Sequence, residues 1–197
     1  MKMYNKARWN NLTAFEKYPE LEKIYDTINY HNCGVFWGLE NKNRVIEDLA
    51  RMKDEIKSGT NGGNYFSLYT TPYWYYILNV DDLLKQRLYG KFMIFTKNPE
   101  DKDLQKNLKE IVNRGLSPMI KYSTDKPSFQ SKRDKNGNIT SKIICIYADR
   151  DYRKISNLAY FIKTHNMIRK DIPFQASYEW GYGRSKINKK MMLSDFV

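Results

Sequence analysis

Aromatic and basic side chains occur together near the end of the sequence, in "SYEWGYGRSKINKK". Nucleobases stack on exposed aromatic rings, while lysine and arginine bind phosphates. The glycines at 181 and 183 predict an exposed loop. Trp180 and Tyr182 are therefore candidates for stacking on a base, and Arg184 is a candidate for contacting a phosphate. An idle tail is the alternative interpretation of the same residues.

A second group of rings lies in "YFSLYTTPYWYYIL", residues 65 to 78. Aromatic and β-branched residues favour strands, so two strands are predicted on either side of Pro72. Side chains alternate between the faces of a strand. Trp74 and Tyr76 therefore share one face, and Tyr73 and Tyr75 share the other. We predict that one face is buried core and the other is a contact surface, with Trp74 as a candidate ligand-binding residue.

Basic residues accompany a polar segment between two predicted strands, "SPMIKYST" and "KIICIYA". The segment, "DKPSFQSKRDKNGNITS", contains an Asn136-Gly137 pair, which favours the positive φ angles of a tight hairpin turn. The candidates for holding phosphates in this region are Lys121, Lys126, Lys132 and Arg133.

Catalytic and metal-binding patterns are weak by comparison. The segment "SGTNGGN" follows a predicted helix and lacks the phosphate-loop pattern, so it is interpreted as a helix stop. His31 and Cys33 form only one local pair, whereas a metal site needs clustered ligands. The acidic pairs at 81–82 and 149–151 are at predicted helix starts, where they complement the helix dipole. We predict no catalytic set, no metal and no cofactor, and we favour a protein that is not an enzyme.

The net charge of the chain narrows the classes of partner that the protein could bind. The formal net charge is +12, and nine of these excess positive charges come from the last 77 residues, where sixteen Lys and Arg face seven Asp and Glu. A basic surface attracts nucleic acid or nucleotides, and it attracts acidic proteins equally. Alternatively, the charge serves only solubility.

The two cysteines indicate reduced thiols, and no apolar run has the length of a signal sequence or membrane span, so a soluble cytoplasmic protein without a membrane partner is predicted.

Hydrophobic spacing predicts the elements that position these residues. Helices are expected over residues 20–29, 40–57, 99–115 and 151–166, and one or two further helical turns are expected over 81–88 with Asp81 as their cap. Strands are expected over 33–39, 65–69, 73–80, 91–95, 117–124, 142–148 and 172–180. This order predicts an α/β or α+β fold in a single domain, residues 1–180, with one sheet and its helices on one face. Residues 181–197 are predicted to form a basic C-terminal loop or tail.

Three stretches resemble a known family: "GKFMIFTKNPED", "IVNRGLSPMIKYST" and "KIICIYADRDYRKISNLAYFIKTHNM", with "IPFQASYEW" closing. Across residues 90–178 this order is similar to that of the uncharacterised phosphothreonine lyase domain proteins, whose fold is similar to the cap-binding translation initiation factor 4E. The resemblance implies a single curved, mostly antiparallel sheet backed by about three helices. It also implies a phosphate-contacting strand end near Lys121 and Lys126. The segment "NVDDLLKQRLYG" lacks the tryptophan that precedes the matching strand in cap-binding factors.

The leading functional prediction is a non-enzymatic binding protein that recognises a phosphorylated partner, RNA or a nucleotide, through a basic face bearing aromatic rings. A second prediction is a protein-binding inhibitor or adaptor encoded by a virus or mobile element, which the compact size and the Lys-, Asn- and Tyr-rich composition favour. A third is an enzyme acting on a nucleotide or phosphoprotein.

Overall fold

The computed structural model divides the chain into two compact units, residues 1–64 and 65–197. Each unit is described by itself, and the single domain predicted over 1–180 stays a prediction. The residues that the structure describes are 12–31, 42–59, 66–71, 74–85, 88–123, 132–176 and 191–197.

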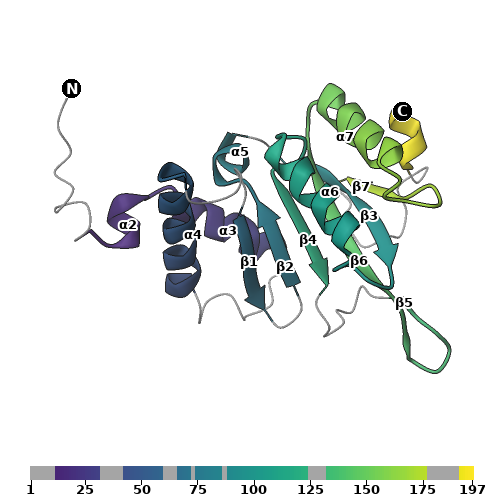
Figure 1. Cartoon of the computed structure of the whole chain (residues 1–197), viewed down its shortest axis with the longest axis horizontal. Helices are drawn as coiled ribbons and strands as arrows, with labels where there is room; N and C mark the ends of the chain where they lie inside the picture. The colour runs from purple at the N-terminus through teal and green to yellow at the C-terminus, as the bar shows by residue number, and fades with distance from the viewer. Residues whose placement is uncertain are drawn as a thin grey trace. The chain divides into compact units, whose positions relative to one another are not determined.

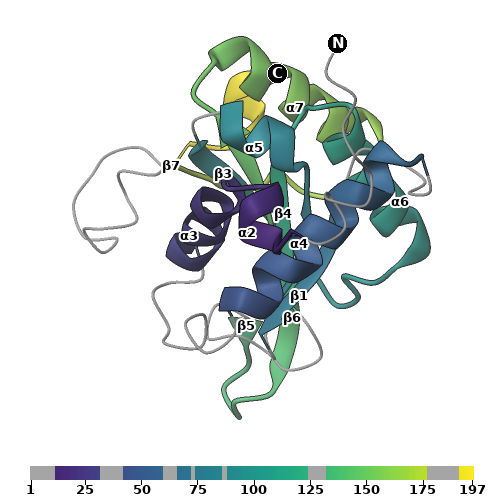
Figure 2. The same cartoon turned by 90° about the vertical axis from the view of Figure 1, so that its left-hand side faces the viewer.

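Helices form the described part of the first unit (Figure 2). The predicted helices are confirmed as α3, Leu21–His31, and α4, Lys42–Lys57, and each buries an apolar face. A short helix, α2 (Ala14–Lys17), was missed by the sequence analysis. It begins with a capping box, in which the side chains of Thr13 and Glu16 each accept a hydrogen bond from the other's backbone N–H. The strand predicted over 33–39 lies outside the described residues.

An open, curved antiparallel sheet forms the centre of the second unit (Figure 1), which confirms the predicted α+β class. Its strands lie in the order β1-β2-β4-β6-β3-β7, and β5 pairs with β6 beside this path. The strands are β1 (Phe66–Thr71), β2 (Trp74–Leu78), β3 (Leu88–Thr96), β4 (Met119–Ser123), β5 (Lys132–Arg133), β6 (Ile139–Asp149) and β7 (Phe174–Ala176).

Three helices of this unit follow the predicted boundaries closely. In α6, Lys102–Asn113, the carboxylate of Asp101 accepts a hydrogen bond from the Leu104 N–H, and Gly115 ends the helix with a φ of 69°. In α7, Tyr152–Thr164, Asp151 is the N-cap. The short helix α5, Val80–Lys85, is capped differently from the prediction. The side chain of Asn79, not Asp81, accepts the N–H at the helix start.

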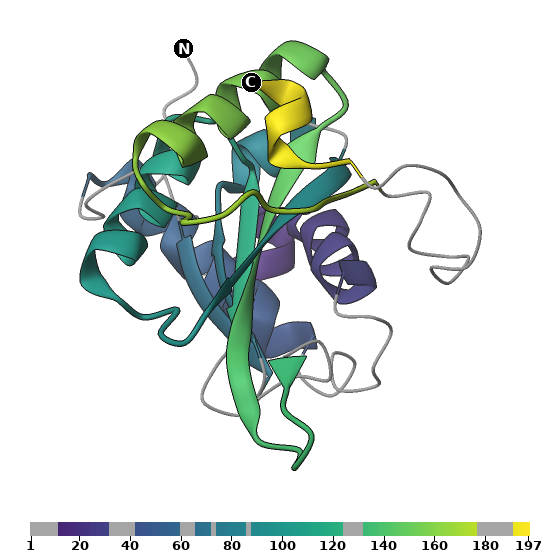
Figure 3. The ribbon, with the colours of Figure 1, turned by 90° about the vertical axis from the view of Figure 1, so that its right-hand side faces the viewer.

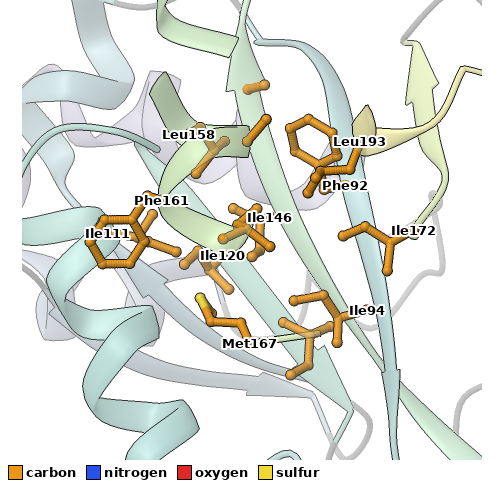
Figure 4. Close-up of a cluster of buried hydrophobic side chains, with 14 of the residues drawn as sticks. Phe92, Ile94, Ile111, Ile120, Ile146, Leu158, Phe161, Met167, Ile172 and Leu193 are labelled. Carbon is orange, nitrogen blue, oxygen red and sulfur yellow. The ribbon is translucent and has the colours of Figure 1, made fainter. Parts of the chain in front are cut away.

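The main hydrophobic core contains residues of the sheet and of α6 and α7 (Figure 4). Ile120 and Ile146 from adjacent strands, together with Leu158 from α7, are completely buried there. Burial of such a side chain contributes about 1.5–3 kcal/mol. In β4, in β6 and from Gly90 onward in β3, the core residues are even-numbered, so the odd-numbered residues occupy the opposite face. Tyr89, beside the irregularity between Leu88 and Gly90, packs against the core instead.

The C-terminal residues differ from the predicted loop or tail. Leu193–Phe196 form a 3₁₀ helix, η3, beside α7 (Figure 3), and Leu193 and Phe196 are buried in the core. The N–H of Leu193 donates to the carbonyl of Ile172, and Asp171 accepts hydrogen bonds from the backbone and the hydroxyl of Ser194. The basic segment that precedes residue 191 lies outside the described residues. The end of the chain is therefore part of the fold.

Strands β3 and β7 approach each other closely at Gly90, and this approach allows a test of how they pack. A Cβ atom added at Gly90 would lie 2.3 Å from Cζ of Phe174 and 2.9 Å from the carbonyl oxygen of Gln175. We expect Gly90→Ala to lower the free energy of unfolding by about 2 kcal/mol, measured by urea denaturation. In a Phe174→Leu background, the same substitution should cost less because the ring atoms are absent. Equal costs in the two backgrounds would contradict this explanation.

Candidate nucleic-acid interface

The predicted binding residues that the structure describes fall into two places. Trp74 and Lys121 lie in the sheet, on β2 and β4, whereas Lys132 and Arg133 form the short strand β5. The predictions for the remaining candidates lie outside the described residues and stay predictions; these are Lys126, Trp180, Tyr182 and Arg184.

Lys121 lies on the sheet face opposite the main core, together with Trp74. Register pairs Lys121 with Tyr76 of β2 and with Cys145 of β6. The Nζ atom of Lys121 is 4.2 Å from the centroid of the Trp74 ring, within the range of a cation–π interaction. Lys121 is 0 % and Trp74 is 5 % exposed. As folded, this pair is therefore an internal contact and not part of an exposed surface.

A second lysine on the same face has a similar environment. Lys91 of β3 is buried, and its Nζ atom lies 6.0 Å from the ring centroid of Tyr147 on the neighbouring strand β6. The register places Lys91 directly opposite Tyr147. Lys91 was not among the predicted binding residues, although the alternation in "GKFMIF" is the signal that places it on the face of β3 opposite the core.

The aromatic run is covered on both faces of β2, where the prediction left one face as a contact surface. Tyr76 is completely buried on the same face as Trp74. On the core face, Tyr75 is half-buried and stacks on Tyr122 of β4, with ring centroids 5.3 Å apart. Burial, together with the negative charges of Glu100 and Tyr75, raises the pKa of Tyr122 to about 12. The described rings of β2 therefore stabilise the sheet and are not an exposed stacking platform.

A protruding hairpin carries the exposed candidates. We define the basic hairpin as residues 132–142, comprising β5, the turn and the first part of β6; it extends beyond the sheet (Figure 3). Every residue from 132 to 140 is exposed. At its base, Lys132 pairs with Ser141, and the Nζ atom of Lys132 lies 4.1 Å from the centroid of the Phe95 ring. The hairpin thus combines exposure and positive charge.

Hydrogen bonds within the turn order the tip of the basic hairpin. The Oδ1 atom of Asp134 accepts from the backbone N–H of Asn136 at 2.8 Å and of Asn138 at 2.9 Å. The Asp134 N–H donates to the carbonyl of Asn138, and the Gly137 N–H donates to the carbonyl of Asp134. A guanidinium N–H of Arg133 donates to the carbonyl of Gly137 at 2.8 Å. These hydrogen bonds join the two strands of the hairpin, and all of their partners are residues of the hairpin itself.

The turn type differs from the predicted one. Positive φ was expected at both Asn136 and Gly137, but among the described residues of the turn only Gly137 has it, with a φ of 82°. A turn followed by one left-handed glycine is typical of a three-residue hairpin loop with a bulge. A separate register shift lies farther from the turn, between Lys132 and Arg133, whose partners Ser141 and Ile139 skip Thr140. The prediction of a hairpin at this position is confirmed.

The charge on the basic hairpin is positive in balance. Lys132, Arg133 and Lys135 are exposed on it, against one acidic residue, Asp134. The hydrogen bonds from the backbone and side chain of Asn138 lower the pKa of the Asp134 carboxyl, so it stays ionised and committed to the turn at neutral pH. Lys135 was not among the predicted binding residues. Its position immediately before the Asn136-Gly137 pair was the signal that could have placed it at an exposed tip.

Metal sites and membrane-spanning helices are both absent from the described residues. Among the described residues, no three His, Cys, Asp or Glu side chains gather where they could hold a metal ion. Within the same ranges, no helix has both the length and the apolar character needed to cross a membrane.

Comparison with known proteins gives no relative: no family model, curated protein or solved structure matches the chain. The resemblance to the phosphothreonine lyase domain proteins and to the cap-binding initiation factor therefore stays a prediction.

Proposed function

We propose that this is a non-enzymatic protein that binds the phosphates of a nucleic acid, RNA included, or of a nucleotide. The observation that carries the proposal is the basic hairpin. It presents Lys132, Arg133 and Lys135 on an exposed turn that is already ordered by its own hydrogen bonds. Phosphate binding needs exposed cations held at low entropic cost, and a preformed turn supplies both.

The expected affinity depends strongly on salt. Each phosphate contact contributes about 0.7 to 0.9 to the slope of log affinity against log salt concentration. Three contacts therefore weaken binding about 20- to 40-fold between ~50 and ~200 mM salt. Fluorescence anisotropy with labelled RNA, DNA and nucleotides measures this slope for the full chain.

A triple variant, Lys132→Gln with Arg133→Gln and Lys135→Gln, should lose this part of the slope and bind about 20-fold more weakly at low salt. The matched control removes three exposed charges outside the hairpin: Lys163→Gln, Arg169→Gln and Lys170→Gln. If the two variants lose affinity equally, the binding reflects net charge and not the basic hairpin. Affinity that does not change with salt, or no binding to any of these ligands, also overturns the proposal.

A further inference from the structure

We propose that the basic hairpin is a two-stranded ribbon that enters the major groove of double-stranded DNA. This inference rests on the proposed function and specifies its ligand. It follows from the chemistry of the tip, from the dimensions of the hairpin and from the rigidity of its turn.

The chemistry of the tip favours a duplex over a single strand. Residues 132–140, "KRDKNGNIT", contain no aromatic side chain. Proteins that bind single strands combine cations with rings on which successive bases stack. Phe95 of β3, beside the base of the hairpin, has the Lys132 ammonium group over its face. The exposed tip instead offers ammonium, guanidinium and amide groups, which bind phosphates and the edges of paired bases.

The dimensions of the hairpin fit the groove of B-form DNA. Paired strands lie about 4.8 Å apart, and the major groove is about 12 Å wide and admits a two-stranded ribbon. From the pair Lys132 and Ser141 to the pair Asp134 and Asn138, the strand advances two residues, about 7 Å, and the turn of Lys135, Asn136 and Gly137 extends beyond it. This reach matches a groove depth of about 8.5 Å. The major groove of A-form RNA is too narrow for side chains to read.

The hairpin presents different chemical groups at its apex and nearer the sheet, and a DNA groove likewise has base edges on its floor and phosphates along its rims. Lys135 and Asn136 occupy the apex, between the two ends of the Asp134–Asn138 hydrogen bond. Amide and ammonium groups pair with acceptors on base edges in the major groove. Lys132 lies farther back, where its ammonium group is over the Phe95 ring, whereas the Arg133 guanidinium lies beside the Gly137 carbonyl in the turn. The hairpin therefore places its base-reading groups in front of Lys132, which would contact a phosphate at the rim of the groove.

A substitution at Asp134 tests the inference, because the loss of its charge and the loss of its hydrogen bonds predict opposite changes in the affinity for DNA. Asp134→Ala removes a negative charge, so attraction alone predicts tighter binding of DNA. It also removes the acceptor for the N–H groups of Asn136 and Asn138. A ribbon that must be preformed then binds more weakly, and we expect about a fivefold loss of affinity. Asp134→Asn is the matched control, because its side-chain oxygen still accepts both backbone hydrogen bonds while the charge is gone; its affinity should equal or exceed that of the unchanged protein.

The ligands for this experiment are a short DNA duplex, an RNA duplex of the same sequence and the corresponding single strands. Anisotropy with the full chain should show the DNA duplex bound at least about tenfold more tightly than the others. Dimethyl sulfate footprinting should show protection of guanine N7, which lies in the major groove. Netropsin, which fills the minor groove, should leave the affinity unchanged.

Three results would overturn the inference. They are tighter binding to duplex RNA or to single strands, competition by netropsin, and an Asp134→Ala variant that binds as tightly as Asp134→Asn. In each of these cases the proposed function survives if the triple hairpin variant still loses its salt dependence. A protein that binds none of the four nucleic acids and no nucleotide overturns the proposed function itself.

Discussion

Replacing Phe196 by alanine should lower the free energy of unfolding by about 3 kcal/mol, although the residue is next to last in the sequence. Its ring centroid lies 5.0 Å from that of Phe174, 5.6 Å from Phe92 and 5.9 Å from Tyr152. The substitution removes a ring from this cluster and leaves a cavity between two strands and the start of α7. Such truncations of buried aromatic rings cost about 3–5 kcal/mol, and the lower value is expected here because Phe196 keeps 9 % of its surface exposed.

Urea denaturation followed by circular dichroism measures this loss. The control is Val197→Ala, one residue further on, where the side chain is exposed and the expected change is within about 0.5 kcal/mol. A truncation of Phe196 that costs no more than this control would show that η3 is not part of the core.

The second large effect is expected at Lys121. Its ammonium group is buried over the π face of Trp74. Lys121→Glu replaces this cation by a carboxylate, which the negative face of the ring repels and which loses its hydration on burial. We therefore expect the free energy of unfolding to fall by about 3–5 kcal/mol, comparable to the breaking of a buried ion pair.

The matched control is the same chemical change at an exposed site, Lys97→Glu, immediately after β3. Surface substitutions of this kind usually change stability by less than about 0.5 kcal/mol. Denaturation of both variants under the same conditions makes the comparison. If Lys121→Glu costs as little as Lys97→Glu, the side chain at 121 is accessible to solvent, and its predicted role in holding phosphates would gain support.

Local signals account for the elements that were predicted correctly. The Asp101 cap and the Gly115 stop of α6 lie within one turn of the helix ends, so neighbouring residues alone decide them. The hairpin at Asn136-Gly137 is equally local. The cap of α5 was misassigned to Asp81 because several polar residues stand at that helix start, and only the backbone shows that Asn79 accepts the hydrogen bond.

The candidate site was predicted in part. Lys132 and Arg133 were expected at a basic, exposed segment, and they lie there. Lys121 was expected among them from its charge and from the family resemblance, but strand alternation places it on a covered face beside Trp74. Lys135 was missed because a single lysine in a polar segment carries no periodic signal; its importance comes from the geometry of the turn.

The sequence by itself therefore determined the α+β class, the main helices and strands, the surplus of positive charge and the presence of a turn before β6. These depend on interactions between residues close together along the chain, or on composition. Only the tertiary structure decided which basic and aromatic side chains are covered. Burial depends on the order of strands in the sheet, which brings Lys121 to Trp74 and Phe196 to Phe92, far apart in sequence. The described rings of β2 became part of the packing of the sheet, and of the described candidate cations only Lys132 and Arg133, on the basic hairpin, are exposed.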